Sequence, residues 1–440
     1  MDILEINSPI KFAQPSESTP AKTIIVHIPK MEVFISSLNP AAFLYEDVTD
    51  EEDIKLCFKE LGEYLKTKNI RMITVEEALF IKGKEEELKQ LAEESLIYQK
   101  ELEYSKKEEK NENEEQRERK ELSKNDFIKY SSDNYRKNVL QKFSKNNLMK
   151  VILTRPSLKL KHIETDTHIE TSSINLNPIG ALVFCRDQQI TTTKGIVMGK
   201  TRTSQRKYEH RIMSQVFKNI GADIIGEIEE EPKAFLEGGD FFVARENLSM
   251  LGVGLRTNIY GAYYLMKKDF LGTRYMAICY DENDKDQQRM HLDTYFNILS
   301  DDYSVVLDFN DVSKNIKNKL NIDRKVYYYD NDNNAKEIES DNEEIKNKVG
   351  EYKLINIYGS FYKFLDDIKF KYIKITHEEQ KQYMINFLNI GNNTVISVNK
   401  NLEKKLKDNG INSIDVKYFY CQPILNIYGG IHCMTQVSRI

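Results

Sequence analysis

The stretch that decides the fold is residues 394–416, which read TVISVNKNLEKKLKDNGINSIDV. Residues 394–398 are apolar and β-branched, as is typical of a strand, and residues 402–407 repeat apolar positions at helical spacing. Gly410 then suits the left-handed conformation that closes a helix, and residues 414–416 resume a strand. The order strand, helix, strand predicts an α/β unit.

Similar units recur along the chain with little sequence identity between them. The first is predicted as a strand at 23–28, a helix marked by the spacing of Ile54, Cys57, Leu61 and Leu65, and a strand at 70–75. Two further copies are predicted over these segments: 195–198, 206–219 and 223–225, then 256–267 and 275–278. The repetition predicts an α/β protein built from successive units.

Size and charge exclude several classes of protein. The 440 residues fill one large domain or two to three ordinary ones. The chain is 30% charged and 40% hydrophobic, yet 64 basic and 69 acidic residues leave a net charge of only −5. No broad basic field for nucleic acid follows from that balance, so a polyanionic partner is disfavoured.

The sequence favours a cytoplasmic protein. The first residues carry no basic segment followed by an apolar one, and no run reaches the ~18 uncharged residues of a membrane helix. The five cysteines are scattered without a CxxC pair, which suits reduced thiols and gives no zinc site. We therefore expect a soluble protein with no membrane partner.

Charged residues dominate an internal segment over 82–124. Leu88, Leu91, Leu96, Ile97 and Leu102 form a narrow apolar stripe within it, which predicts a helical insertion. A disordered charged linker is the alternative for 106–120, where apolar residues are absent. A second polar stretch, 330–344, is rich in Asp, Asn and Glu and predicts an exposed loop that interrupts one α/β unit.

His291 and Asp293 are one residue apart, so on a strand both side chains would face one site. With Glu237 they make a possible ligand set for a divalent metal. A single histidine is weak support for that interpretation, and we expect no metal. Taken alone, the pair also fits a partly buried His followed by a helix-capping Asp.

Glycine pairs stand beside the polar residues that carry chemistry. Gly238-Gly239 predicts a sharp turn or close backbone approach that delivers Glu237 and Asp240 into a cavity, although an ordinary β-turn explains it equally well. Gly429-Gly430 precedes Cys433 in the same way. A buried structural cysteine is the usual alternative for such a thiol, and we assign that role to Cys185.

Together these motifs resemble the arginine deiminase branch of the guanidine-modifying, or pentein, superfamily. The resemblance covers almost the whole chain, because the motifs occur in the family's order. They are Phe184-Cys185-Arg186-Asp187, Arg206-Lys207-Tyr208-Glu209, Leu236-Glu237-Gly238-Gly239-Asp240, Gly252-Val253-Gly254-Leu255-Arg256-Thr257, Met290-His291-Leu292-Asp293-Thr294 and Gly430-Ile431-His432-Cys433-Met434-Thr435.

The resemblance implies a fold: a five-bladed, pseudo-symmetric α/β propeller with a helical insertion after the first blade. On this basis the first blade is expected over 1–80, the charged insertion over 81–150, and the remaining blades with the C-terminal cysteine segment over 151–440.

The resemblance also implies site roles and no cofactor. Cys433 would be the nucleophile and His291 the general acid and base. Asp187 and Asp293 would grip the guanidinium, and Glu237 would position His291. The chemistry is coherent, because paired carboxylates bind a planar cation and that cation favours a neighbouring thiolate. His432 is the alternative base, but on an extended strand it would point away from the side of Cys433.

Substrate recognition is implied for three further residues. Arg206 and Arg256 match positions that hold the amino-acid carboxylate, and Asp240 is expected to contact substrate. The alternative for Arg206 is a solvated helix residue paired with Glu209. Two positions depart from the family, which commonly has arginine where Tyr428 stands and asparagine where Ala181 stands.

The predicted activity is hydrolysis of L-arginine to L-citrulline and ammonia through a covalent amidino-thioether on Cys433. The alternatives within enzymes are a dimethylarginine hydrolase, an agmatine deiminase and an arginine amidinotransferase. A pentein-fold arginine-binding module is the alternative outside enzymes. The sequence leaves a homo-oligomer open.

Overall fold

The stretch quoted first folds as an α/β unit in the computed structural model. It forms β19 (Thr394–Ser397), α13 (Leu402–Asp408) and β20 (Asp415–Tyr418), and β19 pairs with β20 in parallel. Gly410 follows the helix with φ of 78°, as predicted for a left-handed closing residue. The structure describes residues 9–101, 114–163, 168–281, 283–315, 321–340 and 342–440.

The same pattern organises the body of the molecule. Among the described residues outside 81–176, five three-strand groups, one of them part of a six-stranded sheet, each place a central strand antiparallel to one neighbour and parallel to the other. A helical crossover joins the parallel pair, as parallel strands require. The last group is completed by β18 (Leu388–Gly391), which pairs antiparallel with β19.

The first group joins the two ends of the chain. β1 (Thr23–Val26) pairs in parallel with β2 (Arg71–Thr74) and antiparallel with β21 (Gln436–Ser438), and α2 (Glu51–Thr67) is the crossover. Asp50 caps α2 by accepting a hydrogen bond from the backbone N–H of Glu52. Because β21 follows Cys433 closely, this pairing holds the terminal segment against the body.

Two further groups follow the segment 184–188, which leads into the first of them. The first contains β6 (Gln189–Thr191), β7 (Ile196–Met198), α8 (Glu209–Ile220) and β8 (Ile224–Glu227). The second contains β9 (Phe241–Arg245), β10 (Leu248–Val253), α9 (Ile259–Lys267) and β11 (Tyr275–Tyr280). Both helices begin three residues later than predicted, which leaves Arg206 and Arg256 in the loops before them.

The remaining group has the longest crossover. β12 (Phe296–Ile298) and β13 (Tyr303–Leu307) lead through α10 (Phe309–Asn315) into strands that extend the neighbouring sheet. Those strands are β14 (Lys325–Asp330), β15 (Lys348–Val349) and β16 (Tyr352–Tyr358). The chain returns through α11 (Phe361–Asp367) to β17 (Lys371–Ile375). The polar stretch between β14 and β15 has no regular secondary structure among its described residues, as predicted.

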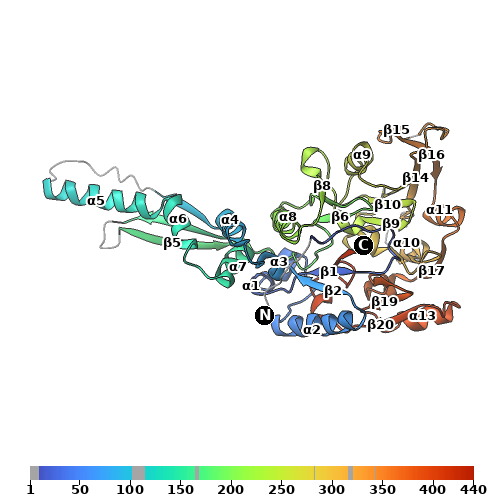
Figure 1. Ribbon diagram of the computed structural model, residues 1–440, viewed down its shortest axis with the longest axis horizontal. Helices are drawn as coiled ribbons and strands as arrows, with labels where there is room; N and C mark the ends of the chain where they lie inside the picture. The colour runs from blue at the N-terminus through green and yellow to red at the C-terminus, as the bar shows by residue number, and fades with distance from the viewer. Residues whose placement is uncertain (1–8, 102–113, 164–167, 282, 316–320, 341) are drawn as a thin grey trace.

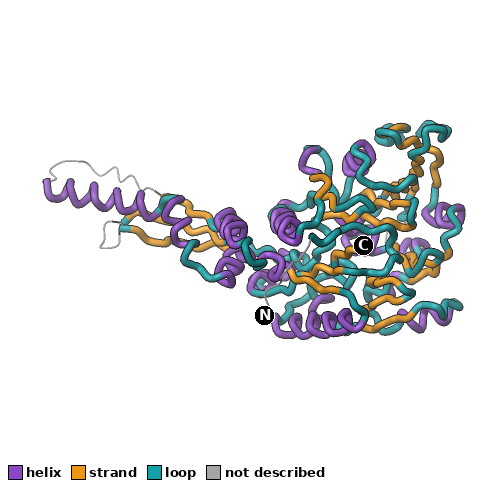
Figure 2. The backbone as a smooth tube through the Cα atoms, in the orientation of Figure 1, coloured by secondary structure: helices purple, strands orange, loops and turns teal. Residues whose placement is uncertain are grey.

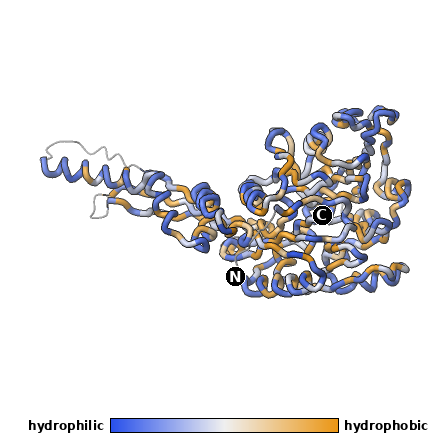
Figure 3. The backbone as a smooth tube through the Cα atoms, viewed as in Figure 1, coloured by the Kyte–Doolittle hydropathy of each residue, from blue (hydrophilic) through white to orange (hydrophobic). Residues whose placement is uncertain are grey.

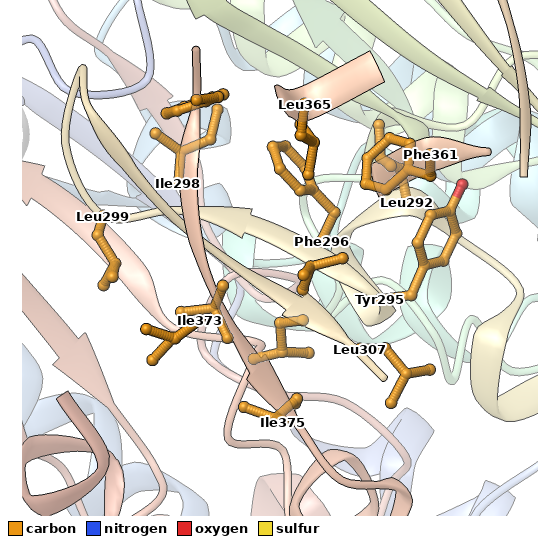
Figure 4. Close-up of a cluster of buried hydrophobic side chains, with 14 of the residues drawn as sticks. Leu292, Tyr295, Phe296, Ile298, Leu299, Leu307, Phe361, Leu365, Ile373 and Ile375 are labelled. Atoms are coloured by element: carbon orange, nitrogen blue, oxygen red, sulfur yellow. The ribbon is translucent and has the colours of Figure 1, made fainter. Parts of the chain in front are cut away.

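Apolar faces of these sheets and helices pack into buried clusters between the groups. One cluster brings together Leu292, Phe296, Leu307, Phe361 and Ile373, and Figure 4 shows these side chains pointing toward one another. The ring of Phe296 meets that of Phe361 edge to face at 5.3 Å between centroids. This cluster supports the turn that carries residues 291–294.

The described residues of 81–176, here called the insertion, project from the body as an arm (Figure 1). Helices cover one end of a sheet in which β4 (Pro156–His162) lies between β3 (Ile97–Glu101) and β5 (Ile169–Leu176). The helices are α4 (Glu85–Ser95), α5 (Glu114–Tyr130), α6 (Asp133–Leu140) and α7 (Lys145–Thr154). Figure 2 shows helix and strand side by side along the arm, and Figure 3 shows how much of α5 is hydrophilic.

The insertion differs from the predicted helical segment. Leu88 and Leu91 are buried on α4, but Leu96 ends that helix in an extended conformation and Ile97 starts β3. The pairing of β3 with β4 overrides the helical stripe, because five consecutive residues find a strand partner. Residues 114–120 are helical, while 106–113 and Leu102 lie outside the described residues. The sheet continues past residue 150, where the boundary was expected.

Short helices complete the body: α1 (Met31–Ser37), α3 (Val75–Leu79), α12 (His377–Lys381) and α14 (Gln422–Leu425). Across the part of the chain that the structure describes, every helix is too short or too polar to cross a bilayer.

Candidate active site

Cys433 lies in a turn between α14 and β21, where it is partly exposed. Its Sγ lies 3.4 Å from Oδ2 of Asp293. Both preceding glycines are required by close packing: a Cβ on Gly429 would lie 2.1 Å from the ring of Phe184, and one on Gly430 would lie 2.5 Å from Oδ1 of Asn386. The glycine pair thus lets the turn press against the body and aims the sulfur into a cavity.

His291 is buried and paired with Glu237. Nε2 of the imidazole lies 2.9 Å from Oε2 of Glu237, and both side chains are almost completely shielded from solvent. Gly239 makes room for the ring, because a Cβ there would lie 2.8 Å from Nδ1 of His291. Gly238 approaches the backbone oxygen of Arg186 just as closely. The predicted turn at Gly238-Gly239 therefore acts through close approach.

Asp187 faces the same cavity from the loop before β6. Nη1 of Arg206 donates to its Oδ2 at 2.8 Å, and its Oδ1 lies 4.0 Å from Nδ1 of His291. That Oδ1 is buried without a hydrogen-bond partner among the described residues. A buried carboxylate oxygen without a donor is costly, so a donor group from a ligand would be stabilised here.

Asp293 lies beside the sulfur of Cys433. Its Oδ2 accepts from Nδ1 of His432 at 2.8 Å, while its Oδ1 is also buried and lacks a partner among the described residues. The predicted strand geometry for His291 and Asp293 is wrong: Asp293 lies in a 3₁₀ turn, Leu292–Thr294, and His291 precedes this turn, its backbone oxygen accepting from the N–H of Thr294. The turn sends the two side chains to different partners around one cavity.

The prediction for His432 also needs correction. Residues 431–434 form a turn and not an extended strand, so the opposite-face argument does not apply. His432 is fully buried, stacks on Phe242 at 5.2 Å between ring centroids, and is bonded to Asp293. It supports a carboxylate of the site, whereas His291 lines the cavity itself.

Arg206 and Arg256 have different surroundings. Arg206 donates to Asp187 and lies 2.9 Å from Oε2 of Glu209, and both carboxylates are buried. The expected alternative, a solvated pair with Glu209, therefore occurs as a buried one. The guanidinium of Arg256 makes no hydrogen bond or ion pair to the residues that the structure describes. Of the two, Arg256 is free to receive a new anion.

Asp240 does not line the cavity. Its Oδ1 accepts from the backbone N–H of Leu292 at 3.0 Å, and its Oδ2 accepts from that of Thr257 at 3.2 Å. Burial raises its pKa to about 7, against the opposing effect of His291. Asp240 thus ties together the loops that carry Glu237, His291 and Arg256.

The cavity has a volume of about 80 Å³. Asp187, Arg206, Arg256, His291 and Cys433 line it, and the remaining wall includes Phe43, Leu44, Phe184, Met290 and Tyr428. Glu237 and Asp293 stand behind His291 and Cys433. Tyr428 and Ala181, the two departures from the family pattern, both lie on the wall.

Burial and charge set the protonation of the two reactive groups. Burial raises the pKa of the Cys433 thiol well above its usual range, and the carboxylates of Asp293 and Asp187 raise it further. For His291, burial opposes the charged form, but Asp187, Glu237 and Asp240 outweigh it and raise the pKa to about 9. At neutral pH these shifts favour a neutral thiol and an imidazolium.

A metal ion would compete with existing contacts. Ligand atoms of Asp187, Glu237 and His291 all lie within 4.8 Å of one another, a set that can hold a divalent cation. The close contact of His291 with Glu237 would have to break to admit the ion. With one nitrogen ligand and that bond in place, the donor set fits acid–base chemistry better.

Sequence reasoning missed two residues that the structure brings to the site. Asn386 contacts Cys433, and no motif around it marks it in the sequence. Glu17 is buried against Arg439 at 2.9 Å and lies 3.6 Å from Nε2 of His432. No local sequence pattern marks either residue, because each contacts a segment that is far away in the chain.

The chain is similar in sequence to proteins of one known family. The family described as "Arginine deiminase" matches residues 83–439. An arginine deiminase of Borreliella burgdorferi (strain ZS7) is 28% identical over 162 residues, which cover 36% of this chain and 39% of the relative. An arginine deiminase of Halobacterium salinarum is 23% identical over 231 residues, with 38% and 47% covered. The chain thus spans less than half the length of these relatives.

Matches to solved structures have lower sequence identity. A dimethylarginine dimethylaminohydrolase adduct is 13% identical, with a TM-score of 0.47 and coverage of 95% of this chain and 99% of that one. The N-terminal domain of ArgZ, an arginine dihydrolase from cyanobacteria, is 15% identical with a TM-score of 0.41, covering 64% and 79%.

The fold and the cavity define an α/β protein with a cysteine, a histidine and acidic side chains gathered at one site. The family match extends over most of the chain and includes each of these residues. The chain belongs to the arginine deiminase family.

Proposed function

We propose that the protein is an arginine deiminase that hydrolyses L-arginine to L-citrulline and ammonia. One observation carries the proposal: among the described residues, two buried carboxylate oxygens lack donors, Oδ1 of Asp187 on the cavity wall beside His291 and Oδ1 of Asp293 directly behind the sulfur of Cys433. A guanidinium is a planar cation with N–H groups on each edge, so it supplies the donors that both oxygens lack.

Binding of that cation prepares the nucleophile. Its positive charge offsets the two carboxylates that hold the Cys433 proton in place, so the pKa of the thiol falls when substrate enters. The Cys433 thiolate attacks the guanidinium carbon and forms a tetrahedral adduct. His291, charged at neutral pH, donates a proton to one nitrogen, and the carbon–nitrogen bond breaks to release ammonia.

Hydrolysis regenerates the thiol. The amidino-thioether on Cys433 is attacked by water, and neutral His291 accepts a proton from that water. Collapse of the second tetrahedral adduct breaks the carbon–sulfur bond, and the hydroxyl proton of the adduct passes to the departing sulfur, which leaves the ureido group of citrulline and the free thiol of Cys433. Glu237 stabilises the imidazolium in both half-reactions, since it is bonded to Nε2 throughout.

Arg256 is the proposed partner of the substrate α-carboxylate. It lines the cavity, and its guanidinium makes no hydrogen bond or ion pair within the described residues. Arg206 holds Asp187 in place through its buried ion pair, and the α-carboxylate of the substrate would add to that network. Tyr428 stands where the family commonly has arginine, so the contacts to the amino-acid end differ here.

Two finer statements belong to the same proposal. The five similar strand groups, closed by the pairing of β21 with β1, support a five-bladed α/β propeller with the insertion after its first blade. All five cysteines are free thiols, which supports a reducing, cytoplasmic location. A homo-oligomer remains compatible with both.

The test is product analysis with purified protein. Arginine, N-methylated arginine, agmatine, and arginine with glycine are incubated separately, and citrulline, carbamoylputrescine, ornithine and guanidinoacetate are measured. Citrulline and ammonia in equal amounts from arginine support the proposal. Guanidinoacetate would indicate an amidinotransferase, turnover confined to agmatine or to methylated arginine would indicate those hydrolases, and arginine binding without any product would indicate a binding module.

A further inference from the structure

Asn386 lies against the sulfur of Cys433 from the loop before β18. It is 2% exposed, and its Nδ2 lies 3.1 Å from Sγ and 3.3 Å from the backbone oxygen of Asp293. Cys433 borders a second small cavity on this side, which Asn386 also lines. The side-chain amide of Asn386 therefore contacts the Cys433 sulfur on the side away from the cavity that Asp187, Arg256 and His291 line.

The orientation of this amide is fixed by its neighbours. Its Oδ1 accepts hydrogen bonds from the backbone N–H groups of His432 at 3.1 Å and Cys433 at 3.3 Å. A flipped amide would place its NH₂ group against these two donors, so only one orientation is satisfied. Gly430 keeps the amide in place, because a Cβ there would overlap Oδ1. Nδ2 is consequently the atom that faces the sulfur.

Near the sulfur, the carboxylates oppose its ionisation, whereas a backbone hydrogen bond of Gly430 favours it. Asp293 and Asp187 raise the pKa of the thiol by their charge, while His432 is turned to Asp293 and the Tyr383 hydroxyl is neutral below a strongly raised pKa. Asn386 is the neutral side-chain N–H donor in this set, and its hydrogen bond lowers the pKa of the thiol. An N–H donor stabilises a thiolate more than a thiol.

We propose that Asn386 is a positioning residue for the nucleophile: its side-chain N–H holds the Cys433 sulfur toward the arginine cavity and stabilises the thiolate. The inference rests on the proposed function in one respect, the role of Cys433 as nucleophile. The same amide also fixes the turn through its two backbone bonds, so orientation of the sulfur and stabilisation of its charge come from one side chain.

The experiment measures alkylation of Cys433 by iodoacetamide between pH 6 and 10.5 in the absence of arginine, with the modified peptide quantified by mass spectrometry. Asn386→Asp keeps the shape and the two backbone bonds but replaces the donor with a charge. It is expected to raise the apparent pKa of the thiol by about one unit or more and to slow alkylation at pH 8 about tenfold. Asn386→Ala should give a smaller shift in the same direction.

Asn389 provides the matched control three residues away. It is equally buried, and its Nδ2 donates to the backbone oxygens of Ile298 at 3.0 Å and Leu299 at 3.1 Å, away from the sulfur. Asn389→Ala should leave the alkylation profile of Cys433 unchanged. Thermal unfolding of each variant identifies any that fail to fold, and Asn386→Ala is then compared with Asn389→Ala directly.

Steady-state kinetics with arginine add a second readout. Asn386→Asp should lower kcat about a hundredfold while KM changes by less than about threefold, because the amide touches the nucleophile and not the amino-acid end. Alkylation profiles of both Asn386 variants that coincide with the unsubstituted protein overturn the inference, even if citrulline is formed. A shifted profile in a protein that forms no citrulline supports the inference and contradicts only the proposed function.

Discussion

The insertion and the candidate active site use charge in opposite ways. In the insertion, α5 carries a local and exposed ion pair: Arg119 pairs with Glu115 one turn away, and the two side chains are 78% and 73% exposed. At the site, the pairs join distant segments in a dry interior, as His291 does with Glu237 across 54 residues. Charges cluster in both regions, but the buried arrangement of the site raises the pKa of His291 to about 9.

The comparison separates two kinds of charged residue that look alike in the sequence. Exposed pairs are screened by water and contribute little, whereas buried pairs hold each other in position because neither charge has another partner. Burial by distant segments, and not charge density, therefore marks the chemistry. Substitutions of single residues are expected to have large effects at the site and small effects in the insertion.

The largest expected effect is from Cys433→Ala. Loss of the nucleophile should lower kcat for citrulline formation at least about 10⁴-fold, because no other group in the cavity can form the covalent intermediate. Binding of arginine, measured by calorimetry, should persist, since the carboxylates remain. Cys279→Ala removes a thiol buried in the sheet core and should retain nearly full activity. Comparable loss in both variants would contradict the assignment.

Glu237→Gln comes next. The pKa of His291 is raised to about 9, so the imidazolium proton is present below that pH and lost above it, and kcat/KM should fall as pH rises through about 9. Without the Glu237 charge the pKa of His291 falls, so this limb should move to lower pH and kcat should drop about 10²- to 10³-fold. Glu229→Gln, exposed on the same segment, is the control. An unmoved limb would exclude Glu237 as the partner.

A stability test follows from Arg289, which is buried in the loop before His291. Its Nε donates to Oδ2 of Asp284 at 2.6 Å, and its side chain is fully shielded. Arg289→Ala leaves Asp284 buried with less compensation and should lower the free energy of unfolding by about 3–5 kcal/mol. Denaturant unfolding measures the change. A loss below about 1 kcal/mol would show that such pairs behave like those of the insertion.

Arg256→Leu should act on substrate recognition. Loss of one charged hydrogen-bonding partner costs about 1.5–3 kcal/mol, so KM for arginine should rise about 10- to 100-fold with a smaller change in kcat. Turnover of agmatine, which lacks the carboxylate, should change far less if it is detectable. Equal effects on both substrates would show that Arg256 does not contact the carboxylate.

The smallest effect is expected in the insertion. Arg119→Ala removes the exposed pair with Glu115 and should change the free energy of unfolding by no more than about 0.5 kcal/mol. Raising the salt concentration should reduce even that difference. A change above about 2 kcal/mol, measured by the same unfolding assay as for Arg289→Ala, would mean that α5 is supported by charge more than its exposure indicates.

Local patterns predicted much of the fold. The spacing in 402–407 and the glycine at 410 gave a helix and its end, because both depend on backbone geometry within a few residues. The insertion was harder. Ile97 continues an apolar helical stripe in the sequence, yet it starts a strand because β4 supplies partners from 60 residues further along.

The sequence named the members of a candidate site but not their connections. Motifs in the family's order pointed to Cys433, His291, Glu237, Asp187 and Asp293, and the structure brings all five to one cavity or directly behind it. The turn at 291–294 and the support from Asn386 could not be predicted, since both depend on which distant backbone groups need partners. The role of Asp240 could not be predicted either, because its carboxylate accepts hydrogen bonds from two backbone N–H groups that lie far away in the chain.

The central claim is that the Cys433 sulfur attacks a guanidinium held by buried carboxylates. The most direct test is to mix the protein with arginine, quench in acid within milliseconds to seconds, and map the modified peptide by mass spectrometry. A mass increase equal to arginine minus ammonia is expected on the peptide containing Cys433, with none on the peptide containing Cys279. Citrulline formation with no adduct on Cys433 at any time, or an adduct on another residue, would contradict it.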